Sequence, residues 1–239
     1  MIRDCAAGPA GAAGDADADA VQAADDLELV AGISRTPVGE ALDAAPVDVL
    51  VDYTHPSVVK GNVLAALERR VAVVVGTSGL TAADYDEIDA LARSAGVGAI
   101  AAGNLSVGAA LLLRFATEAA RHLGAWEVID YASATKPDAP SGTSRELAER
   151  LGRAAPTPEP LGAPEARGAN VAGTHVHSLR LPSFTVSTEV VLAGPGERLS
   201  IRHDAGESAS PYVAGTLLAI RAVPGLAGLT RGLDTLLGP

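Results

Sequence analysis

One short stretch of the chain combines a lysine, a turn and the start of a helix. It runs Lys136-Pro-Asp-Ala-Pro-Ser-Gly-Thr143, and its two prolines interrupt any regular helix or strand. Residues 145–153, which follow, have helical character. The first N–H groups of a helix and the positive end of its dipole bind carboxylates and phosphates. The stretch therefore predicts an anion-binding turn, in which Lys136 contacts the same anion or donates a proton. The predicted anion contacts are Ser141, Gly142 and Thr143.

The same residues also have an explanation that needs no ligand. Serine and threonine commonly cap a helix that follows a proline turn. Lys136 would then be an ordinary solvated side chain. The local sequence leaves both interpretations open, so the remainder of the chain has to separate them.

Length and composition limit the class of protein. A chain of 239 residues suits one large domain or two small ones, and 48% hydrophobic residues with 20% charged residues predict a folded core. The net charge of −11 without a basic cluster argues against nucleic acid and anionic membranes as partners. A small anionic substrate is not excluded, because a local site can still be positive.

The cysteine count and the hydropathy pattern bear on compartment and cofactors. The single Cys5 excludes an intramolecular disulfide and a multi-cysteine metal site. No His/Asp/Glu set has metal-ligand spacing, so no metal is expected. No uninterrupted apolar run of transmembrane length and no signal peptide are visible, and we therefore expect a cytoplasmic protein.

The first half of the chain alternates short apolar runs with helical stretches. The predicted strands are residues 27–31, 47–52, 71–75 and 97–102, and the predicted helices between them are residues 57–69 and 82–95. Strands that are apolar throughout are typical of a parallel sheet covered by helices on both faces. The pattern predicts the α/β class, with a Rossmann-like parallel sheet.

Glycines spaced by three lie near the N-terminus, at Gly8, Gly11 and Gly14. The spacing loosely matches the glycine-rich turn of a dinucleotide-binding βαβ unit. Residues 2–7 make a poor first strand because Arg3 and Asp4 interrupt the apolar run. A flexible leader rich in alanine, glycine and aspartate is the alternative interpretation.

The residue about 20 positions after such a glycine turn lies beside the adenosine ribose. An acid there favours NAD, whereas an arginine can pair with the 2′-phosphate of NADP. The chain has Ser34-Arg35 at that place, which favours NADPH over NADH. An ordinary exposed loop arginine is the alternative.

Small polar turns follow three of the later strands. They are Asp52-Tyr-Thr-His-Pro56, Gly76-Thr-Ser-Gly79 and Gly103-Asn-Leu-Ser-Val-Gly108. In open α/β sheets, ligands bind outside the carboxyl ends of the strands. Three such turns together predict a ligand site at this edge of the sheet.

The pattern changes near residue 105 from α/β to α+β. A helix is predicted over residues 109–123, a loop over 154–169 and a last helix over 212–221. The predicted strands are residues 126–131, 175–180, 184–192 and 197–203, the last two joined by the turn at 193–196. Their alternating character predicts a mixed or antiparallel sheet with one face open to a ligand or a partner subunit.

Several motifs now resemble one family. Lys136-x-Asp138-Ala-Pro-Ser-Gly-Thr143 is similar to the K-x-D-A-P-S-G-T signature of the 4-hydroxy-tetrahydrodipicolinate (dihydrodipicolinate) reductase family, and the resemblance covers nearly the whole chain. Further similar motifs are Gly76-Thr-Ser-Gly79, Asn104-Leu-Ser-Val-Gly108, His177-Ser-Leu-Arg180 and Gly196-Glu-Arg-Leu-Ser-Ile-Arg-His203.

The resemblance implies a function and a division of the chain. It implies a Rossmann-like cofactor domain, residues 1–105 with 211–239, and a central domain, residues 106–210, that binds substrate and builds a homotetramer. It implies hydride transfer from NADPH or NADH to a small cyclic, unsaturated dicarboxylate in lysine biosynthesis. Lys136 would pair with substrate or take part in protonation. The implied substrate contacts are Ser141, Gly142, Thr143 and His177. The implied cofactor contacts are Gly8, Gly11, Arg35, Tyr53, Thr54, Gly76, Thr77, Ser78 and Asn104.

The chain also departs from the family pattern. The family signature has two adjacent histidines, the first its presumed general acid, where this chain has Ala132 and Ser133. Neither side chain can replace imidazole as a proton donor near neutral pH. Ala12-Ala13 replaces a basic residue of the glycine turn, and Ala209 replaces a late arginine.

These departures leave three hypotheses for the function. The first is an NAD(P)H-dependent reductase of a cyclic imine or unsaturated acid, with a possible change of substrate. The second is a repurposed family member that catalyses non-redox chemistry, such as dehydration or cyclisation. The third is a ligand-binding pseudoenzyme.

His175 and His177 share one face of a predicted strand. Either could replace the lost acid, or both could be ordinary sheet residues or substrate contacts.

Overall fold

The computed structural model describes residues 1–8, 12–33, 36–154, 161–206 and 210–238. The chain divides into two units. The first unit is Met1–Val107 together with Ser208–Pro239, and the second is Gly108–Glu207.

The first unit is built on a six-stranded parallel sheet in the order β11-β5-β4-β3-β1-β2. The strands are β1 (Ile2–Ala7), β2 (Leu27–Ile33), β3 (Val49–Asp52), β4 (Ala72–Val75), β5 (Gly98–Ala101) and β11 (Gly228–Arg231). All residues of β3, β4 and β5 are buried. This burial explains their uninterrupted apolar sequences, because helices cover both faces of the sheet.

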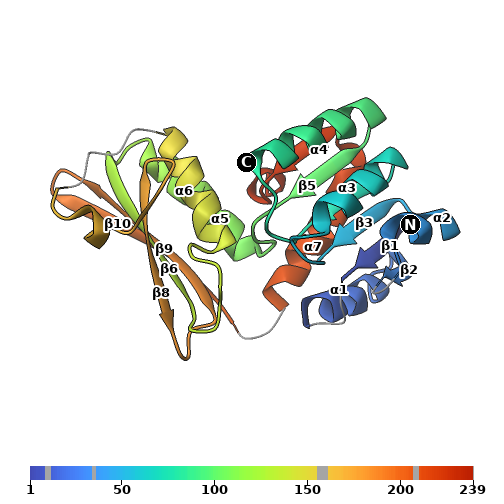
Figure 1. Cartoon of the computed structure of the whole chain (residues 1–239), viewed down its shortest axis with the longest axis horizontal. Helices are drawn as coiled ribbons and strands as arrows, with labels where there is room; N and C mark the ends of the chain where they lie inside the picture. The colour runs from blue at the N-terminus through green and yellow to red at the C-terminus, as the bar shows by residue number, and fades with distance from the viewer. Residues whose placement is uncertain (9–11, 34–35, 155–160, 207–209, 239) are drawn as a thin grey trace. The chain divides into compact units, whose positions relative to one another are not determined.

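The helices of the first unit are α1 (Ala12–Gln22), α2 (Val38–Ala44), α3 (Val59–Glu68), α4 (Ala82–Ala95) and α7 (Ser210–Ala222). Figure 1 shows α3 and α4 on one face of the sheet and α7 on the other. The start and the end of α4 follow from its sequence. Thr81 and Asp84 form a capping box at its start, and Gly96 ends it in the left-handed conformation.

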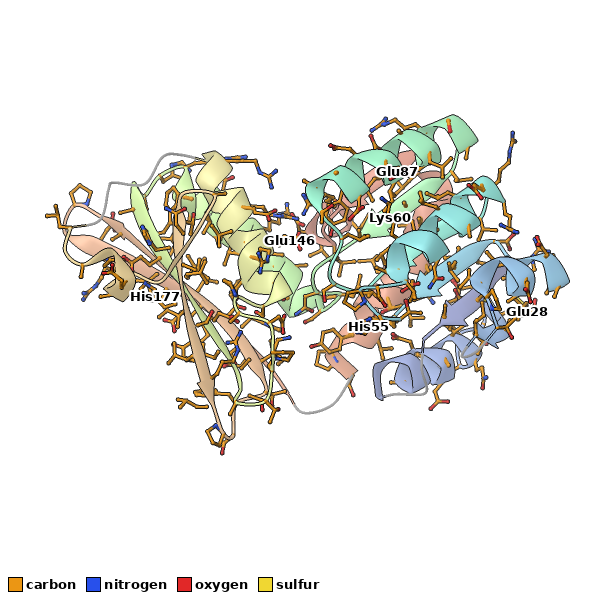
Figure 2. The ribbon with its side chains drawn as sticks, viewed as in Figure 1. Glu28, His55, Lys60, Glu87, Glu146 and His177 are labelled. Carbon is orange, nitrogen blue, oxygen red and sulfur yellow. The ribbon has the colours of Figure 1, made fainter. Side chains whose placement is uncertain are left out.

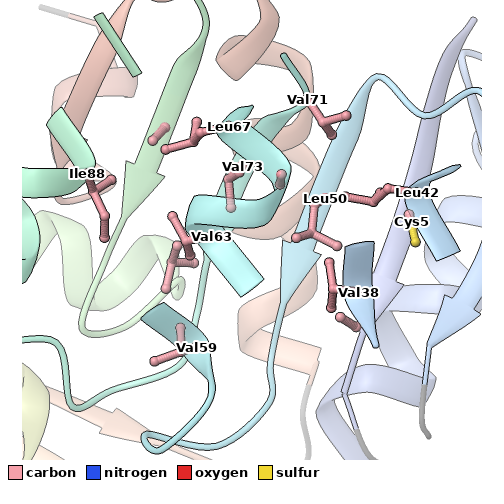
Figure 3. Close-up of a cluster of buried hydrophobic side chains, with 14 of the residues drawn as sticks. Cys5, Val38, Leu42, Leu50, Val59, Val63, Leu67, Val71, Val73 and Ile88 are labelled. Atoms are coloured by element: carbon pink, nitrogen blue, oxygen red, sulfur yellow. The ribbon is translucent and has the colours of Figure 1, made fainter. Parts of the chain in front are cut away.

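One hydrophobic core joins the sheet to these helices. Figure 3 shows Cys5, Leu50 and Val73 of the strands, Leu67 of α3 and Ile88 of α4 within one cluster, and all five side chains are fully buried. Aliphatic side chains of similar size fill this layer, as the sequence predicts for close packing of helices on a sheet.

The second unit contains a five-stranded mixed sheet in the order β10-β9-β6-β8-β7. The strands are β6 (Ala125–Ser133), β7 (Ala169–Val171), β8 (Thr174–Leu181), β9 (Val186–Gly194) and β10 (Glu197–Ala205). Strands β6 and β8 are parallel, and the other pairs are antiparallel. The prediction of a mixed or antiparallel sheet is confirmed, with β8 as the strand that makes it mixed.

Two helices, α5 (Val107–Ala120) and α6 (Gly142–Ala154), pack on this sheet. Alternate residues of β6, among them Trp126 and Val128, are buried against Leu113 of α5 and Leu147 of α6. The intervening residues of β6 are half-buried on the opposite face. The alternation seen in the sequence thus separates a face covered by helices from a more open face.

The structure adds elements that the sequence pattern missed. Helix α2, strand β7 and strand β11 lie where no element is predicted, and a short 3-10 helix, Pro164–Ala166, lies in the predicted loop. The poor first strand over residues 2–7 is present as β1. Within the described part of the chain, no helix has both the length and the apolar character that a membrane span requires.

Candidate active site

The carboxylate of Asp130 lies at the centre of the polar cluster in the second unit. Asp130 is fully buried near the end of β6. It accepts hydrogen bonds from the Ser141 hydroxyl at 2.5 Å and the Ser141 N–H at 2.8 Å. The Arg180 guanidinium of β8 donates to it at 2.8 Å, and the Ser178 hydroxyl at 3.2 Å. Burial acts to raise the pKa of Asp130, but the hydrogen bonds from Ser141 and Arg180 outweigh it, so the net shift is downward.

Lys136 lies in the turn after β6 and is fixed by a neighbour. Its ammonium forms an ion pair of 2.6 Å with Asp138, and about a third of the lysine side chain is exposed. The backbone carbonyl of Asp138 accepts a 2.6 Å hydrogen bond from Arg180. The turn that carries the lysine is therefore tied to β8.

The predicted anion contacts lie at the start of α6. Ser141 precedes the helix and is almost fully buried, and both of its donors are directed at Asp130. Gly142 and Thr143 are the first two helical residues, and Thr143 is buried. Ser144 follows, and its hydroxyl is hydrogen-bonded to Thr188 of β9 at 3.0 Å. The serine side chain thus attaches the helix to the sheet, and the start of α6 is held in a defined position.

The two positions that lack histidine differ in environment. Ala132 is fully buried, and its neighbour in register on β8 is Arg180. Ser133 is half-buried, and its hydroxyl is hydrogen-bonded to Thr135 at 3.0 Å. No side chain at either position can release a proton near neutral pH.

His177 lies on β8, where Figure 2 labels it. Its Nε2 lies 2.7 Å from Glu127 of β6, which also forms an ion pair with Arg167. His175 donates a 2.8 Å hydrogen bond from Nδ1 to the Arg167 carbonyl. Both histidines are half-buried, and the buried Val176 lies between them. They lie on the same face of β8, as predicted, and His177 is paired with an acid of the neighbouring strand.

A second buried aspartate organises the turns at the carboxyl ends of β3 and β4. Asp52, the last residue of β3, accepts hydrogen bonds from the Thr54 N–H and hydroxyl at 2.9 and 2.7 Å. The Thr77 hydroxyl donates at 2.8 Å and the Asn62 amide at 2.9 Å. The predicted cofactor contacts Thr54 and Thr77 are thereby brought together by a single carboxylate.

Tyr53 and two glycines pack closely at the same edge of the sheet. The Tyr53 hydroxyl is hydrogen-bonded to Thr216 of α7 at 2.7 Å. A Cβ at Gly76 would lie 2.3 Å from the Tyr53 ring, and a Cβ at Gly8 would lie 3.1 Å from the Tyr53 carbonyl oxygen. A side chain at Gly76 would therefore displace the Tyr53 ring, whereas Gly8 makes a close but less restrictive contact.

The remaining predicted cofactor contacts are distributed as follows. Ser78 is exposed in the turn after β4. Asn104 lies after β5, where its side-chain oxygen accepts a 2.8 Å hydrogen bond from the Ser106 N–H. Gly11 and Arg35 fall outside the described residues.

The topology of the first unit fits a dinucleotide cofactor. Strand β1 lies between β2 and β3, so the strand order reverses at β1. Ligands bind at this switch point, outside the carboxyl ends of the strands. Gly8 ends β1 there, Tyr53 and Thr54 follow β3, and α1 begins four residues after Gly8. Among the described residues, no group of three or more His, Cys, Asp or Glu side chains is placed to hold a metal ion.

A parallel sheet of this topology, together with a unit that carries a lysine turn at a fixed helix start, fits the class of NAD(P)H-dependent reductases. Two family models identify the family within that class. The model "Dihydrodipicolinate reductase, N-terminus" matches residues 3–105, and "Dihydrodipicolinate reductase, C-terminus" matches residues 108–236. The chain belongs to the dihydrodipicolinate reductase family, and it is an oxidoreductase that uses a nicotinamide cofactor.

Relatives along the whole chain agree. The 4-hydroxy-tetrahydrodipicolinate reductase of Nocardia farcinica is 41% identical over 99% of this chain and 98% of its own length. That of Cutibacterium acnes is 37% identical over 100% of this chain and 99% of its own. A solved structure, dihydrodipicolinate reductase from Paenisporosarcina sp. TG-14 with dipicolinate bound, has a TM-score of 0.82 and 28% identity, and covers 99% of this chain and 100% of that one. These findings favour the reductase over the non-redox and ligand-binding alternatives.

The two organising aspartates were not among the predicted site residues. Asp52 and Asp130 are each an acid at a buried position of a strand, followed by a turn that contains serine or threonine. A buried carboxylate needs several donors. That sequence signal, an acid inside a buried strand next to a polar turn, could have identified both.

Proposed function

We propose that the chain reduces a cyclic, unsaturated dicarboxylate of the kind for which its relatives are named, 4-hydroxy-tetrahydrodipicolinate, as a step of lysine biosynthesis. The observation that carries the proposal is the lysine turn of the second unit. In it, Lys136 and the start of α6 are fixed by one set of hydrogen bonds around Asp130, Arg180 and Asp138. A dicarboxylate has two anionic groups, and this turn offers an ammonium and a helix N-terminus to bind them.

Each group in the turn has a proposed role in that reaction. Gly142 and Thr143, at the N-terminus of α6, hold one substrate carboxylate, and Ser141 sets the position of that helix start. His177, the other predicted substrate contact, pairs with Glu127 on the opposite face of the sheet, so it is not proposed as a contact of this carboxylate. Lys136 stays within reach of the substrate because Asp138 fixes its ammonium.

We propose that Lys136 also supplies the proton. A reduced nicotinamide, when bound, supplies a hydride to the electrophilic carbon of the C=N or conjugated C=C bond. The other end of the reduced system needs a proton, and the family's histidine is replaced by Ala132 and Ser133. An ammonium can donate that proton, and the resulting amine regains one from water. Positioned proton donors contribute about 10²–10⁴-fold to a rate.

The cofactor contacts form the second part of the proposal. Gly8 and Gly11 would lie beside the pyrophosphate and Arg35 beside a 2′-phosphate, which favours NADPH over NADH. The nicotinamide contacts are proposed to be Tyr53, Thr54, Gly76, Thr77, Ser78 and Asn104. The hydrogen bonds of Asp52 to Thr54 and Thr77 keep these two turns together before any ligand binds.

Calorimetric titration and turnover test the reductase proposal. The purified protein would be titrated with NADPH and NADH, and consumption of the reduced cofactor would be followed with 4-hydroxy-tetrahydrodipicolinate. We expect both cofactors to bind, NADPH more tightly, with one cofactor oxidised for each substrate reduced. A protein that binds neither cofactor, or that binds one but never oxidises it, would overturn the proposal.

Lys136 can be tested against a matched control, because the sequence has only two lysines. Lys60, the other one, forms ion pairs with Asp84 and Glu87 between α3 and α4, and Figure 2 labels Lys60 and Glu87 there. Replacing Lys136 by methionine is expected to lower kcat by about 10²–10⁴-fold. Lys60→Met is expected to leave kcat and KM unchanged. Equal turnover of the two variants would exclude Lys136 as the donor.

The same proposal covers the oligomeric state, the cellular compartment and the roles of the two parts of the chain. We infer a cytoplasmic homotetramer formed through the open face of the five-stranded sheet. Residues 1–105 with 211–239 would bind the cofactor, and residues 106–210 would bind the substrate and the other subunits.

A further inference from the structure

Asp130 has two connections that lead to different parts of the lysine turn. It is fully buried on β6, and neither its backbone nor its side chain is in a position to contact solvent. Both carboxylate oxygens are used: Oδ1 by the Ser141 hydroxyl, and Oδ2 by the Ser141 N–H and by Arg180. A group that touches no solvent but fixes several neighbours acts through those neighbours.

The first connection leads to the start of α6. Ser141 donates both its hydroxyl and its backbone N–H to Asp130, and its carbonyl accepts the Arg145 N–H at 2.9 Å. Ser141 therefore attaches the first turn of the helix to β6. The positions of the Gly142 and Thr143 N–H groups follow from that of Ser141, since they are the next two residues in the chain.

The second connection leads to Lys136. Arg180 donates to Asp130 at 2.8 Å, and the same Nη2 donates to the Asp138 carbonyl at 2.6 Å. The Asp138 side chain in turn holds the Lys136 ammonium at 2.6 Å. Arg180 also donates from Nη1 to the Asp130 carbonyl at 3.3 Å and the Leu179 carbonyl at 3.0 Å. The guanidinium thus binds strand, turn and carboxylate at once.

We propose that Asp130 is the positioning residue that sets the anion-binding start of α6 and the Lys136 ammonium in one fixed relation. The proposal rests on the proposed function, because it assigns those two groups to the substrate. A carboxylate suits the task because it only accepts hydrogen bonds, and all its side-chain partners here are donors. The downward shift of its pKa keeps it ionised at neutral pH.

An asparagine side chain has nearly the same size as aspartate, but at this position it would disturb the hydrogen-bond network. Its amide group has one oxygen and one NH2. In one orientation the NH2 would face the Ser141 hydroxyl, which would have to turn and accept from it instead of donating. In the other orientation the NH2 would face the Arg180 guanidinium and the Ser141 N–H, which places donors against donors. Both orientations remove the charge that pairs with Arg180. Asp130→Asn should therefore displace the helix start, the lysine, or both.

The experiment compares Asp130→Asn with wild type and with Asp43→Asn, a change at an exposed surface ion pair. Dipicolinate is the probe for the anion site, measured by calorimetry, and NADPH binding is measured on the same samples. We expect Asp130→Asn to weaken dipicolinate binding and to lower kcat, each by about 10- to 100-fold, as small displacements of positioned groups do. NADPH affinity should stay within about twofold of wild type, as should every property of Asp43→Asn.

Two further variants test the two connections one at a time. They also provide the test if the Asp130→Asn protein does not fold. Ser141→Ala removes one donor at the helix start and should mainly weaken dipicolinate binding. Arg180→Lys keeps the charge but loses the planar fork, so it should mainly lower kcat through Lys136. In a protein that already carries Lys136→Met, the further change Asp130→Asn should lower kcat by a smaller factor than it does in wild type. The second connection leads to the Lys136 ammonium, which that protein has already lost.

The outcomes distinguish this inference from the proposed function. If wild type binds no dipicolinate and oxidises no cofactor, the proposed function fails, and this inference fails with it. If wild type does both, and the Asp130, Ser141 and Arg180 variants lose only thermal stability while their dipicolinate affinity, KM and kcat stay at the wild-type values, Asp130 is a structural residue and the inference is overturned.

Discussion

Ala132 occupies the position of the family's presumed acid and is fully buried there. It lies on the same face of β6 as Val128, which belongs to the core cluster with residues of α6. The family's presumed acid therefore cannot be restored by substitution alone, because an imidazole would need space that the packed neighbours occupy.

Ala132→His is accordingly expected to lower the free energy of unfolding by about 1–3 kcal/mol and not to raise kcat. Ser133→His is the matched change, because Ser133 is half-buried on the opposite face. It should cost less than about 1 kcal/mol. Thermal denaturation and steady-state kinetics on both variants provide the check. A more active Ala132→His protein would show that this position still has room for the acid.

Residue types were easier to predict than the directions of their hydrogen bonds. The motif identified Lys136 and the turn up to Thr143, and it placed them next to a helix start, as observed. It did not show that Ser141 directs both donors at Asp130, eleven residues earlier, or that Tyr53 reaches Thr216, 163 residues later. Such partners depend on which strands become neighbours, and local spacing does not contain that information.

At the scale of elements, two glycines in helices have opposite surroundings. A Cβ at Gly152 of α6 would lie 1.9 Å from the Ala172 carbonyl oxygen between β7 and β8, whereas a Cβ at Gly61 of α3 would meet nothing within 4 Å. The first glycine lets the helix approach the hairpin. The second has no packing role of this kind.

Gly152→Ala should therefore lower the melting temperature, and Gly61→Ala should raise it. The gain at Gly61 is expected to be about 0.5–1 kcal/mol, because alanine favours the helix more than glycine does. The loss at Gly152 should exceed about 2 kcal/mol, because backbone atoms have to move. Calorimetric melting of both variants tests the pair. Two shifts of the same sign would contradict this account.

Strand β1 and helix α1 each contain a buried acid that forms no ion pair with another described residue. Asp4 and Asp17 are almost fully buried, and each has one carboxylate oxygen that lacks a hydrogen-bond partner within the described structure. Burial raises the pKa of Asp4 to about 7 and that of Asp17 to about 6. The folded protein therefore binds these protons more tightly than the unfolded chain does.

The stability that these two acids contribute is present below their unfolded pKa of about 4 and is lost as the pH rises to about 7. Asp4→Asn should remove part of that loss. Relative to wild type, it should gain stability at pH 8 but not at pH 4, at about 1.4 kcal/mol for each unit of pKa shift removed. Asp19→Asn, an exposed change on α1, is the control. Urea unfolding at both pH values is the measurement, and a gain of equal size at both would refute the explanation.

Strand β1 also shows why some elements were harder to predict from the sequence than others. The central strands were recognised because burial on both faces makes them apolar throughout. Asp4 lowers the apolar character of β1, although the strand is present. Strand β11 has only four residues and depends on its pairing with β5 and on Asp89, which accepts the Leu229 N–H at 2.7 Å. These tertiary contacts stabilise a segment that has no strand pattern of its own.

At the scale of the whole molecule, the open face of the five-stranded sheet supports the proposed homotetramer. Tyr131, Glu189 and Arg202 form a cluster there: the tyrosine hydroxyl donates to Glu189 at 3.0 Å, and Arg202 lies 4.6 Å from the centre of the tyrosine ring. Val191 lies on the same face, in register with Glu127 and Ser200. Interfaces between subunits combine apolar and polar side chains in this way, so the face is compatible with the proposed contact.

Val191→Asp would place a carboxylate beside Glu127 on that face, so it should convert the tetramer into smaller species. Leu161→Asp, which changes a highly exposed leucine, should not alter the assembly. Light scattering after size-exclusion chromatography reports the mass of each protein. A wild-type protein that elutes as a monomer would disprove the tetramer directly.

The position of Cys5 makes the chain convenient for site-directed labelling. Cys5 is the only cysteine of the sequence, it is fully buried in the core below α2 and α3, and burial raises the pKa of its thiol to about 12. The reactive thiolate is therefore scarce at neutral pH. A cysteine introduced at an exposed position such as Ser78 would react with a maleimide dye while Cys5 stays unmodified. The natural chain can thus carry a single fluorophore beside the proposed cofactor turn without removal of its own cysteine.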